Sequence, residues 1–310
     1  MPIKINADYL RHSSKNVGTL DKWKRLFVDR RKNFPFLLNI LAGYKPYLFE
    51  DVFARVKKFL PDGIDVCITS SGLFDKTLYD IAENYGWSYL STTINNVSIA
   101  QNLAILLHEN AQMIFKMDED IFVTQNCFGK LIQTYEHCQT KGRYNVGFVA
   151  PLIPVNGYGH VRILEKLGLD EYYEKNFERI IYGAQPHRMI EKSPEVAKFF
   201  WGEGDVIPSI DLMNAAFQIR KMEYRNCSSR FSIGLILFHK NVWTKMGGWQ
   251  IPATGSGIGI DEIQICRFCV DCSLGMIISE NVVVGHLSFG QQNEAMKEYY
   301  LTHREKFRCP

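Results

Sequence analysis

Three acidic side chains stand side by side inside an apolar stretch. The run "KMDEDIF" covers residues 116–122 and places Asp118, Glu119 and Asp120 between hydrophobic residues. Adjacent carboxylates repel one another and lose hydration on burial, so such a run is costly in a core. An acid–x–acid turn can hold a divalent cation, because Mg²⁺ and Mn²⁺ prefer oxygen ligands. The run therefore predicts a Mn²⁺ or Mg²⁺ site that also faces substrate phosphates.

The residues that lead up to the acids alternate between strand and helix patterns. Strands are expected at 34–43, 63–72, 87–93 and 112–123, and helices at 46–60, 73–86 and 96–111. This order predicts an α/β fold with a mostly parallel, Rossmann-type central sheet and helices on both faces. Ligands bind such sheets at the carboxyl ends of the strands, where Asp118 and Asp120 fall. The carboxylates are thus expected in a cleft.

The second half of the chain is less regular in its middle. A helix is expected at 127–142 and a strand at 144–155, whereas 156–229 mixes charged helical stretches with several Pro and Gly. The pattern then returns with a strand at 231–240, a Gly-rich loop at 253–259, a helix at 261–272 and a strand at 277–290.

Charge is uneven along the 310 residues, whose net charge is only +3. The segment before Phe34 holds nine basic residues against three acids. Such an arm could contact DNA or an anionic membrane, or it could be a solvated surface helix. No secretory signal or run of about 20 apolar residues is present, so no integral membrane segment is expected. We expect a cytoplasmic protein, either free or peripheral to the inner face of the membrane, with its eight cysteines reduced.

Three cysteines lie close together in "CRFCVDC", at positions 266, 269 and 272. A ferredoxin-type run would need a fourth cysteine at Met276, and a zinc ribbon would need a second CxxC pair. Their helical spacing instead predicts small core residues.

The order of elements ending in DxD resembles the GT-A fold of nucleotide-sugar-dependent glycosyltransferases. Four further stretches are similar to segments of that family: "NNVSIAQNLAI" (95–105), "FSIGLILFHKNVWTKMGGW" (231–249), "GIDEIQICR" (259–267) and "VVVGHLSFG" (282–290). The resemblance spans roughly 34–155 and 230–290. It implies a basic N-terminal segment (1–33), a nucleotide-sugar-binding half (34–155) and an acceptor-binding, catalytic half of the same domain (156–310).

The resemblance also implies the residues of a reaction centre. Asp118 would face the ribose or the metal, Asp120 would coordinate the metal, and neutral His286 would be the third protein ligand. Asp261 or Glu262 would be the general base that accepts the proton of an acceptor hydroxyl. The family pattern is Glu then Asp, and this chain has Asp then Glu, which leaves both open with a lean toward Asp261. Asp261 could also simply cap its helix. A base in line with the leaving group implies inversion.

Donor and acceptor residues follow from the same resemblance. The donor, expected as a UDP-sugar, would contact Ala42, Gly43, Tyr44, Ser70, Ser71, Asn102, Lys116 and Glu119. Tyr44 would stack on the base, and Ser70 or Ser71 would replace the family's uracil-reading Asp, or the base differs. Lys116 would lie near the diphosphate or be an exposed edge-strand residue. Gly248 and Trp249 would meet the acceptor, with Trp249 either stacking on its ring or half-buried in the core.

These features together predict a metal-dependent glycosyltransferase that acts on a hydroxyl of a surface glycan, a lipid-linked saccharide or a modified DNA base. One alternative is a nucleotidyltransferase on a related α/β scaffold, although its Gly-rich basic loop is missing after the first strand. Another is a non-catalytic nucleotide-sugar-binding module. The sequence does not favour a Rossmann dehydrogenase, since no GxGxxG follows the first strand.

Overall fold

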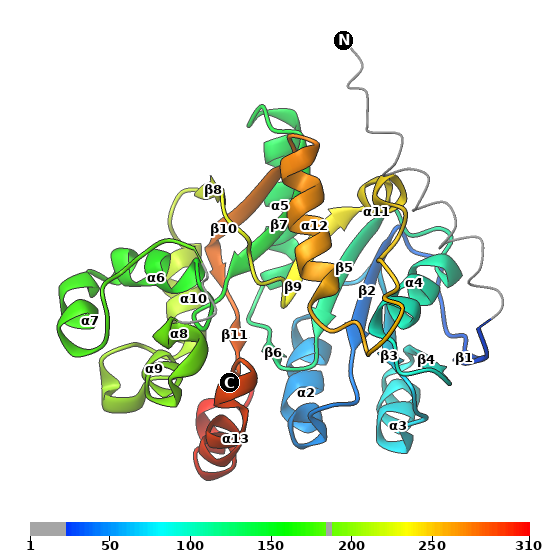
Figure 1. Cartoon of the computed structure of the whole chain (residues 1–310), viewed down its shortest axis with the longest axis horizontal. Helices are drawn as coiled ribbons and strands as arrows, with labels where there is room; N and C mark the ends of the chain where they lie inside the picture. The colour runs from blue at the N-terminus through cyan, green and yellow to red at the C-terminus, as the bar shows by residue number, and fades with distance from the viewer. Residues whose placement is uncertain (1–22, 184–187) are drawn as a thin grey trace.

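The computed structural model describes residues 23–183 and 188–310 (Figure 1). Four cations of the basic segment before Phe34 (Lys4, Arg11, Lys15 and Lys22) lie outside the described residues. The described part of that segment contains a strand at Arg25–Val28 and no helix. Among the described residues, no helix is both long and apolar enough to cross a membrane.

Strands and helices alternate through the first half, as the sequence predicts. The strands are β1 (Arg25–Val28), β2 (Phe36–Leu41), β3 (Ile64–Ser70), β4 (Ser88–Thr92), β5 (Met113–Asp118), β6 (Ile121–Phe122), β7 (Val146–Leu152), β8 (Tyr224–Asn226), β9 (Leu235–His239), β10 (Gly275–Val283) and β11 (Gly285–His286). The α-helices are α2 (Phe49–Phe59), α3 (Lys76–Tyr85), α4 (Val97–Leu107), α5 (Cys127–Thr140), α6 (Gly159–Leu167), α7 (Asp170–Asn176), α8 (Met189–Lys192), α9 (Pro194–Phe200), α10 (Ile210–Gln218), α11 (Lys240–Met246), α12 (Ile260–Asp271) and α13 (Asn293–Thr302). Short 3-10 turns lie at Pro46–Leu48, Glu203–Asp205, Gly290–Gln292 and Arg304–Lys306.

Nine strands of the described residues form one sheet in the order β1-β4-β3-β2-β5-β9-β7-β10-β8. Neighbours from β4 to β5 are parallel, as the strand–helix alternation predicts. The α/β class and the large central sheet are therefore confirmed. The sheet is mixed, however: β9 runs antiparallel between β5 and β7, and β1 pairs antiparallel with β4 at the edge. One sheet thus runs through both 34–155 and 156–310.

Local chemistry accounts for the helices that flank the parallel strands. The side chain of Asp75 accepts a hydrogen bond from the Leu78 amide at 3.0 Å and caps α3, which ends at Gly86 in the left-handed conformation. Asn96 caps α4 in the same way, 3.1 Å from the Ile99 amide. α4 packs on β2, β3 and β4, whereas α5 packs on β7, β9 and β10. Figure 1 shows α6 to α10 gathered at the β10 side of the sheet.

The prediction of small core residues is confirmed for two of the three clustered cysteines. Cys266 and Cys269 are buried in the core, Cys272 is partly exposed, and all three are free thiols.

Two arginines of the basic segment before Phe34 form polar contacts in the structure. Arg30 donates to the Trp87 carbonyl at 3.1 Å, and Arg31 pairs with Asp29 at 2.6 Å.

Strand register brings the polar loops together at the carboxyl edge. Leu41 of β2 lies opposite Thr69 of β3 on one side and Asp118 of β5 on the other. The loop after β2 therefore leaves the sheet beside the acidic turn after β5. This is the edge at which an open α/β sheet binds its ligand.

Candidate active site

A small two-stranded ladder brings His286 to the acidic turn. β6 follows the acids directly and pairs with β11, so that Ile121 lies opposite His286, and the Leu287 amide donates to the Asp120 carbonyl at 3.1 Å. A Cβ on Gly285 would lie 2.3 Å from the indole of Trp201, which donates to the His286 carbonyl at 3.1 Å. Glycine at 285 thus lets Trp201 pack against the ladder and fix the backbone of His286.

The side chains of Asp120 and His286 meet at this ladder. Their Oδ2 and Nε2 atoms are 3.4 Å apart, and the other ring nitrogen of His286, Nδ1, is 3.0 Å from the Val155 carbonyl. Burial alone would raise the pKa of Asp120, but His286 and Lys45 outweigh it and hold that pKa well below its usual range. Burial would lower the pKa of His286, but the Asp120 carboxylate outweighs it and raises that pKa.

Lys45 is the second partner of Asp120, and the sequence analysis did not select it. Its Nζ lies 2.5 Å from Asp120 Oδ2, and 17% of its side chain remains exposed. Burial opposes the charge on this amine, yet Asp120 raises the pKa of Lys45 above its ordinary value. A lone lysine in a loop carries no periodic signal, so only the β2–β5 register reveals its position.

Glu119, the middle acid, turns away from Asp120 and holds the loop that carries Lys45. Its carboxylate accepts from the Gly43 amide at 2.7 Å and from the Tyr44 amide at 2.9 Å. Burial nevertheless raises the pKa of Glu119 to about 7. The prediction that Glu119 contacts the donor is therefore replaced by a positioning role. The same two bonds occupy the amides of Gly43 and Tyr44.

Lys116 lies between Asp118 and Asp261. Its Nζ is 2.8 Å from Asp118 and 3.5 Å from Asp261, and it also donates to the Ile233 carbonyl at 3.3 Å. Lys116 is buried on a central strand, so the interpretation as an exposed edge residue is wrong. Burial raises the pKa of Asp118 to about 6, against the lowering effect of Lys116.

A divalent cation fits part of the predicted ligand set. Asp120 Oδ2 and His286 Nε2 are separated by 3.4 Å, near the roughly 3 Å expected for adjacent ligands of an octahedral ion. Asp118 does not join them, because its carboxylate faces Lys116. Within residues 23–183 and 188–310, no three His, Cys, Asp or Glu side chains are grouped as a metal site. Of the three expected metal ligands, Asp120 and His286 thus lie together and Asp118 lies apart from them.

The structure places the two candidate bases differently. Asp261 is buried beside Lys116 and accepts from Gln101 Nε2 at 3.2 Å and from the adjacent Glu262 amide at 2.9 Å. It does not cap its helix, because it lies inside α12, whose N-cap is Gly259. The carboxylate of Glu262 pairs with Arg230 instead. Gln101 is a further residue that sequence reasoning missed, because a glutamine within a helix gives no distinct signal.

The predicted acceptor platform is contradicted. Trp249 is fully buried and packs edge-on against Phe238, so its ring cannot stack on an acceptor. The Gly248 carbonyl is occupied by Gln264 Nε2 at 2.9 Å. Asn102 is also buried; its oxygen accepts from the Trp249 amide at 2.7 Å and from Trp243 Nε1 at 2.9 Å. Asn102 therefore holds the 247–249 turn and does not reach a donor.

The other residues that were predicted to bind the nucleotide-sugar donor differ in how accessible their side chains are. Ser70 is fully buried between Tyr89 and the Leu73 carbonyl, and Ala42 is fully buried, so neither side chain reaches a ligand. Ser71 has a buried hydroxyl without a hydrogen-bond partner among the described residues. Tyr44 is 42% exposed and donates to Asn95 at 2.8 Å. Tyr44 and Ser71 remain the donor candidates of this group.

Comparison with known proteins finds a similar solved structure and no match in sequence. No family model matches the chain, and no curated protein matches it in sequence. Among solved structures, it is similar to the mannosyltransferase PcManGT from Pyrobaculum calidifontis in complex with GDP-Man and Mn²⁺, with a TM-score of 0.47 and 11% identity. The match covers 97% of this chain and 72% of that one.

Proposed function

We propose that this chain is a divalent-cation-dependent glycosyltransferase that moves a sugar from a nucleotide diphosphate to an acceptor hydroxyl with inversion. The observation that carries the proposal is the Asp120–His286 pair, held 3.4 Å apart at the carboxyl edge of the sheet by the β6–β11 ladder. Carboxylate and imidazole donors at that edge suit a cation shared with phosphates. The resemblance implies a UDP-sugar as the donor. The acceptor that it implies is a hydroxyl of a surface glycan, a lipid-linked saccharide or a modified DNA base.

His286 is oriented for this role by its backbone contact. A carbonyl oxygen can only accept, so Nδ1 must carry the proton that bonds to the Val155 carbonyl. In its neutral form, His286 presents the lone pair of Nε2 toward Asp120, and a cation between the two would relieve their repulsion. Asp120 and His286 would hold the ion, which when bound neutralises charge on the leaving diphosphate.

Lys45 is proposed as the protein's own contact to that diphosphate. It is the more exposed of the two site lysines, with 17% of its side chain accessible against 5% for Lys116. A bound ion would compete with Lys45 for Asp120, leaving the ammonium to pair with the donor phosphates. Lys116 compensates the charges of Asp118 and Asp261 and keeps their carboxylates together.

Asp261 is proposed as the general base. The acceptor oxygen attacks the anomeric carbon as its proton passes to the Asp261 carboxylate. The bond from that carbon to the phosphate oxygen breaks, and its electron pair leaves with the nucleoside diphosphate. Glu262 is less suited, because Arg230 holds its carboxylate.

A thermal-shift screen tests the proposal. UDP, GDP, their sugars and the nucleoside triphosphates UTP and GTP are each added with Mn²⁺, with Mg²⁺ or with EDTA, and the unfolding midpoint is recorded. Binding to the folded state raises the midpoint by mass action. We expect at least one nucleotide diphosphate to raise it only with the cation. A nucleoside triphosphate that alone raises it would favour the nucleotidyltransferase alternative.

A further inference from the structure

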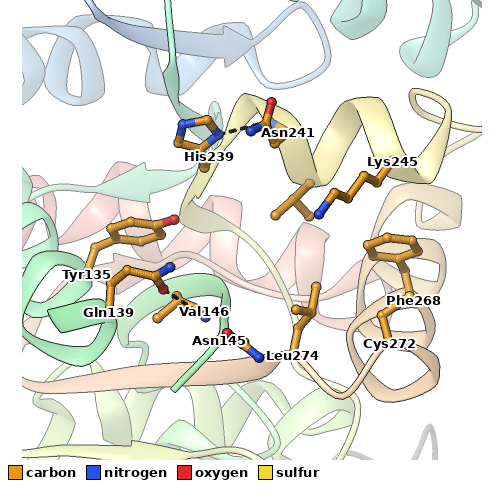
Figure 2. Close-up of a pocket in the computed structure, with 11 residues that line it drawn as sticks. Tyr135, Gln139, Asn145, Val146, His239, Asn241, Lys245, Phe268, Cys272 and Leu274 are labelled. Carbon is orange, nitrogen blue, oxygen red and sulfur yellow. Dashed lines mark hydrogen bonds between the residues drawn. The ribbon is translucent and has the colours of Figure 1, made fainter. Parts of the chain in front are cut away.

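A cavity of about 570 Å³ opens at the edge of the sheet opposite the acids (Figure 2). It includes His239, which lies opposite Met113 at the start of β5, and Val146, the first residue of β7. Asp118 ends β5, so the full length of that strand separates the cavity from the acids. The cavity therefore belongs to neither the donor nor the acceptor site proposed above.

The lining combines an apolar surface with polar groups that mostly donate. Val146, Val242, Phe268 and Leu274 supply the apolar part. Figure 2 shows the Lys245 amine and the Tyr135 hydroxyl directed into the space. None of the eleven lining residues is an aspartate or glutamate. The only full charge on its wall is thus the positive charge of Lys245.

Two contacts fix which groups can donate. His239 Nδ1 accepts from the backbone amide of Asn241 at 3.0 Å, so the proton of the neutral imidazole lies on Nε2. Partial burial and, to a smaller extent, the positive charge of Lys245 lower the pKa of His239. Gln139 uses its oxygen to accept from the Val146 amide at 3.2 Å, which leaves its NH₂ group as a donor. Nε2 of His239, the Gln139 amide and Lys245 therefore offer donors.

We propose that this cavity binds a small molecule that carries an anionic group on an aromatic or apolar body. Its volume lies within the roughly 300–1,000 Å³ of small-molecule sites, which pair apolar walls with a few polar groups. An anion is favoured because Lys245 and the donors meet no competing carboxylate on the wall. The site does not depend on the proposed transferase activity, so either can fail without the other.

The chain carries its own reporter for this test. All eight cysteines are free; Cys272 and Cys309 are partly exposed, and the other six are buried. Cys272 lines the cavity and Cys309 does not. Alkylation by iodoacetamide, followed by peptide mass spectrometry, measures both thiols in one sample.

Phenyl phosphate is the probe, and benzyl alcohol is its neutral counterpart. We expect phenyl phosphate at about millimolar concentration to slow alkylation of Cys272 while Cys309 reacts as before. Lys245→Gln should weaken this protection by about tenfold, the typical worth of one charged hydrogen bond. His239→Asn, which retains a cap for α11, should weaken it less.

Arg267→Gln is the matched control, since it removes an exposed positive charge from α12 outside the cavity. Three results would each overturn the proposal. The first is no protection of Cys272 by phenyl phosphate, and the second is equal protection by benzyl alcohol. The third is a loss in Arg267→Gln as large as that in Lys245→Gln.

Discussion

The Nε2 atom of His286 lies 3.4 Å from Oδ2 of Asp120, although the two residues come from different halves of the sequence. The ladder of β6 and β11 makes this contact, and the Val155 carbonyl sets the tautomer of the imidazole. The clustered carboxylates at 118–120 are therefore tolerated in three ways. Lys116 pairs with Asp118, two backbone amides hold Glu119, and Lys45 with His286 neutralises Asp120.

Asp120→Asn should remove transfer activity. The amide keeps the shape of the carboxylate and loses its charge, so we expect the cation-dependent rate to fall by at least about 100-fold. Donor hydrolysis and transfer are measured with Mn²⁺ present. Asp80→Asn on exposed α3 is a control of the same chemistry and should retain the wild-type rate. Full activity in Asp120→Asn would remove Asp120 from the reaction.

Asp261→Asn and Glu262→Gln separate the two candidate bases. We expect Asp261→Asn to lower transfer by about 10²- to 10⁴-fold, the usual worth of a general base, with donor affinity unchanged. Glu262→Gln should lose less than about tenfold, because Arg230 already occupies its carboxylate. Both are assayed for transfer and, by calorimetry, for donor binding. The reverse order of losses would assign the base to Glu262.

Glu119→Ala should loosen the loop that carries Lys45. Two backbone amides would lose their shared acceptor, so the free energy of unfolding should fall by about 1–3 kcal/mol. Donor affinity should fall as well, because Lys45 is no longer held at Asp120. Denaturant titration and donor titration are compared with Glu109→Ala, an exposed acid. Wild-type stability and affinity together would contradict the positioning role.

Asn102→Ala tests the revised role of this residue. The backbone amide of Trp249 and the indole N–H of Trp243 would both lose their acceptor in the core. The free energy of unfolding should therefore fall by about 2–4 kcal/mol. Asn110→Ala, at an exposed turn, should be near neutral. Donor affinity measured well below the unfolding midpoint should be unchanged. A tenfold loss of affinity without a loss of stability would restore the donor-binding role.

His160 should make stability depend on pH. Burial lowers its pKa to about 4, although the Asn156 carbonyl accepts from Nδ1. The folded state then binds this proton more weakly than the unfolded state, whose histidine titrates near 6.5. Stability is complete above about pH 6.5 and is lost as pH falls toward 4, by about 3 kcal/mol in total. Denaturant titrations of wild type and His160→Phe should diverge in that window; parallel curves would contradict the assignment.

The sequence predicted the parallel half of the sheet because each strand there is followed by its own helix. It could not predict β9 between β5 and β7, or the β6–β11 ladder, since both depend on pairing between distant segments. Asp118 and Asp120 were selected by type and spacing, whereas Asp261 and His286 were selected through the resemblance to the glycosyltransferase family. Lys45 and Gln101 were not, because their positions follow from register and helix packing alone. Trp249 was misread because burial of a glycine-flanked tryptophan is a tertiary property.

The most direct test is calorimetric titration of Mn²⁺ into the protein saturated with the nucleoside diphosphate that the thermal screen selects. Wild type should bind the ion with that nucleotide, whereas Asp120→Asn and His286→Gln should each bind it at least about tenfold more weakly. Asp80→Asn should match wild type. Equal Mn²⁺ affinity in wild type and both site variants, or none in wild type, would contradict the claim that Asp120 and His286 hold the cation.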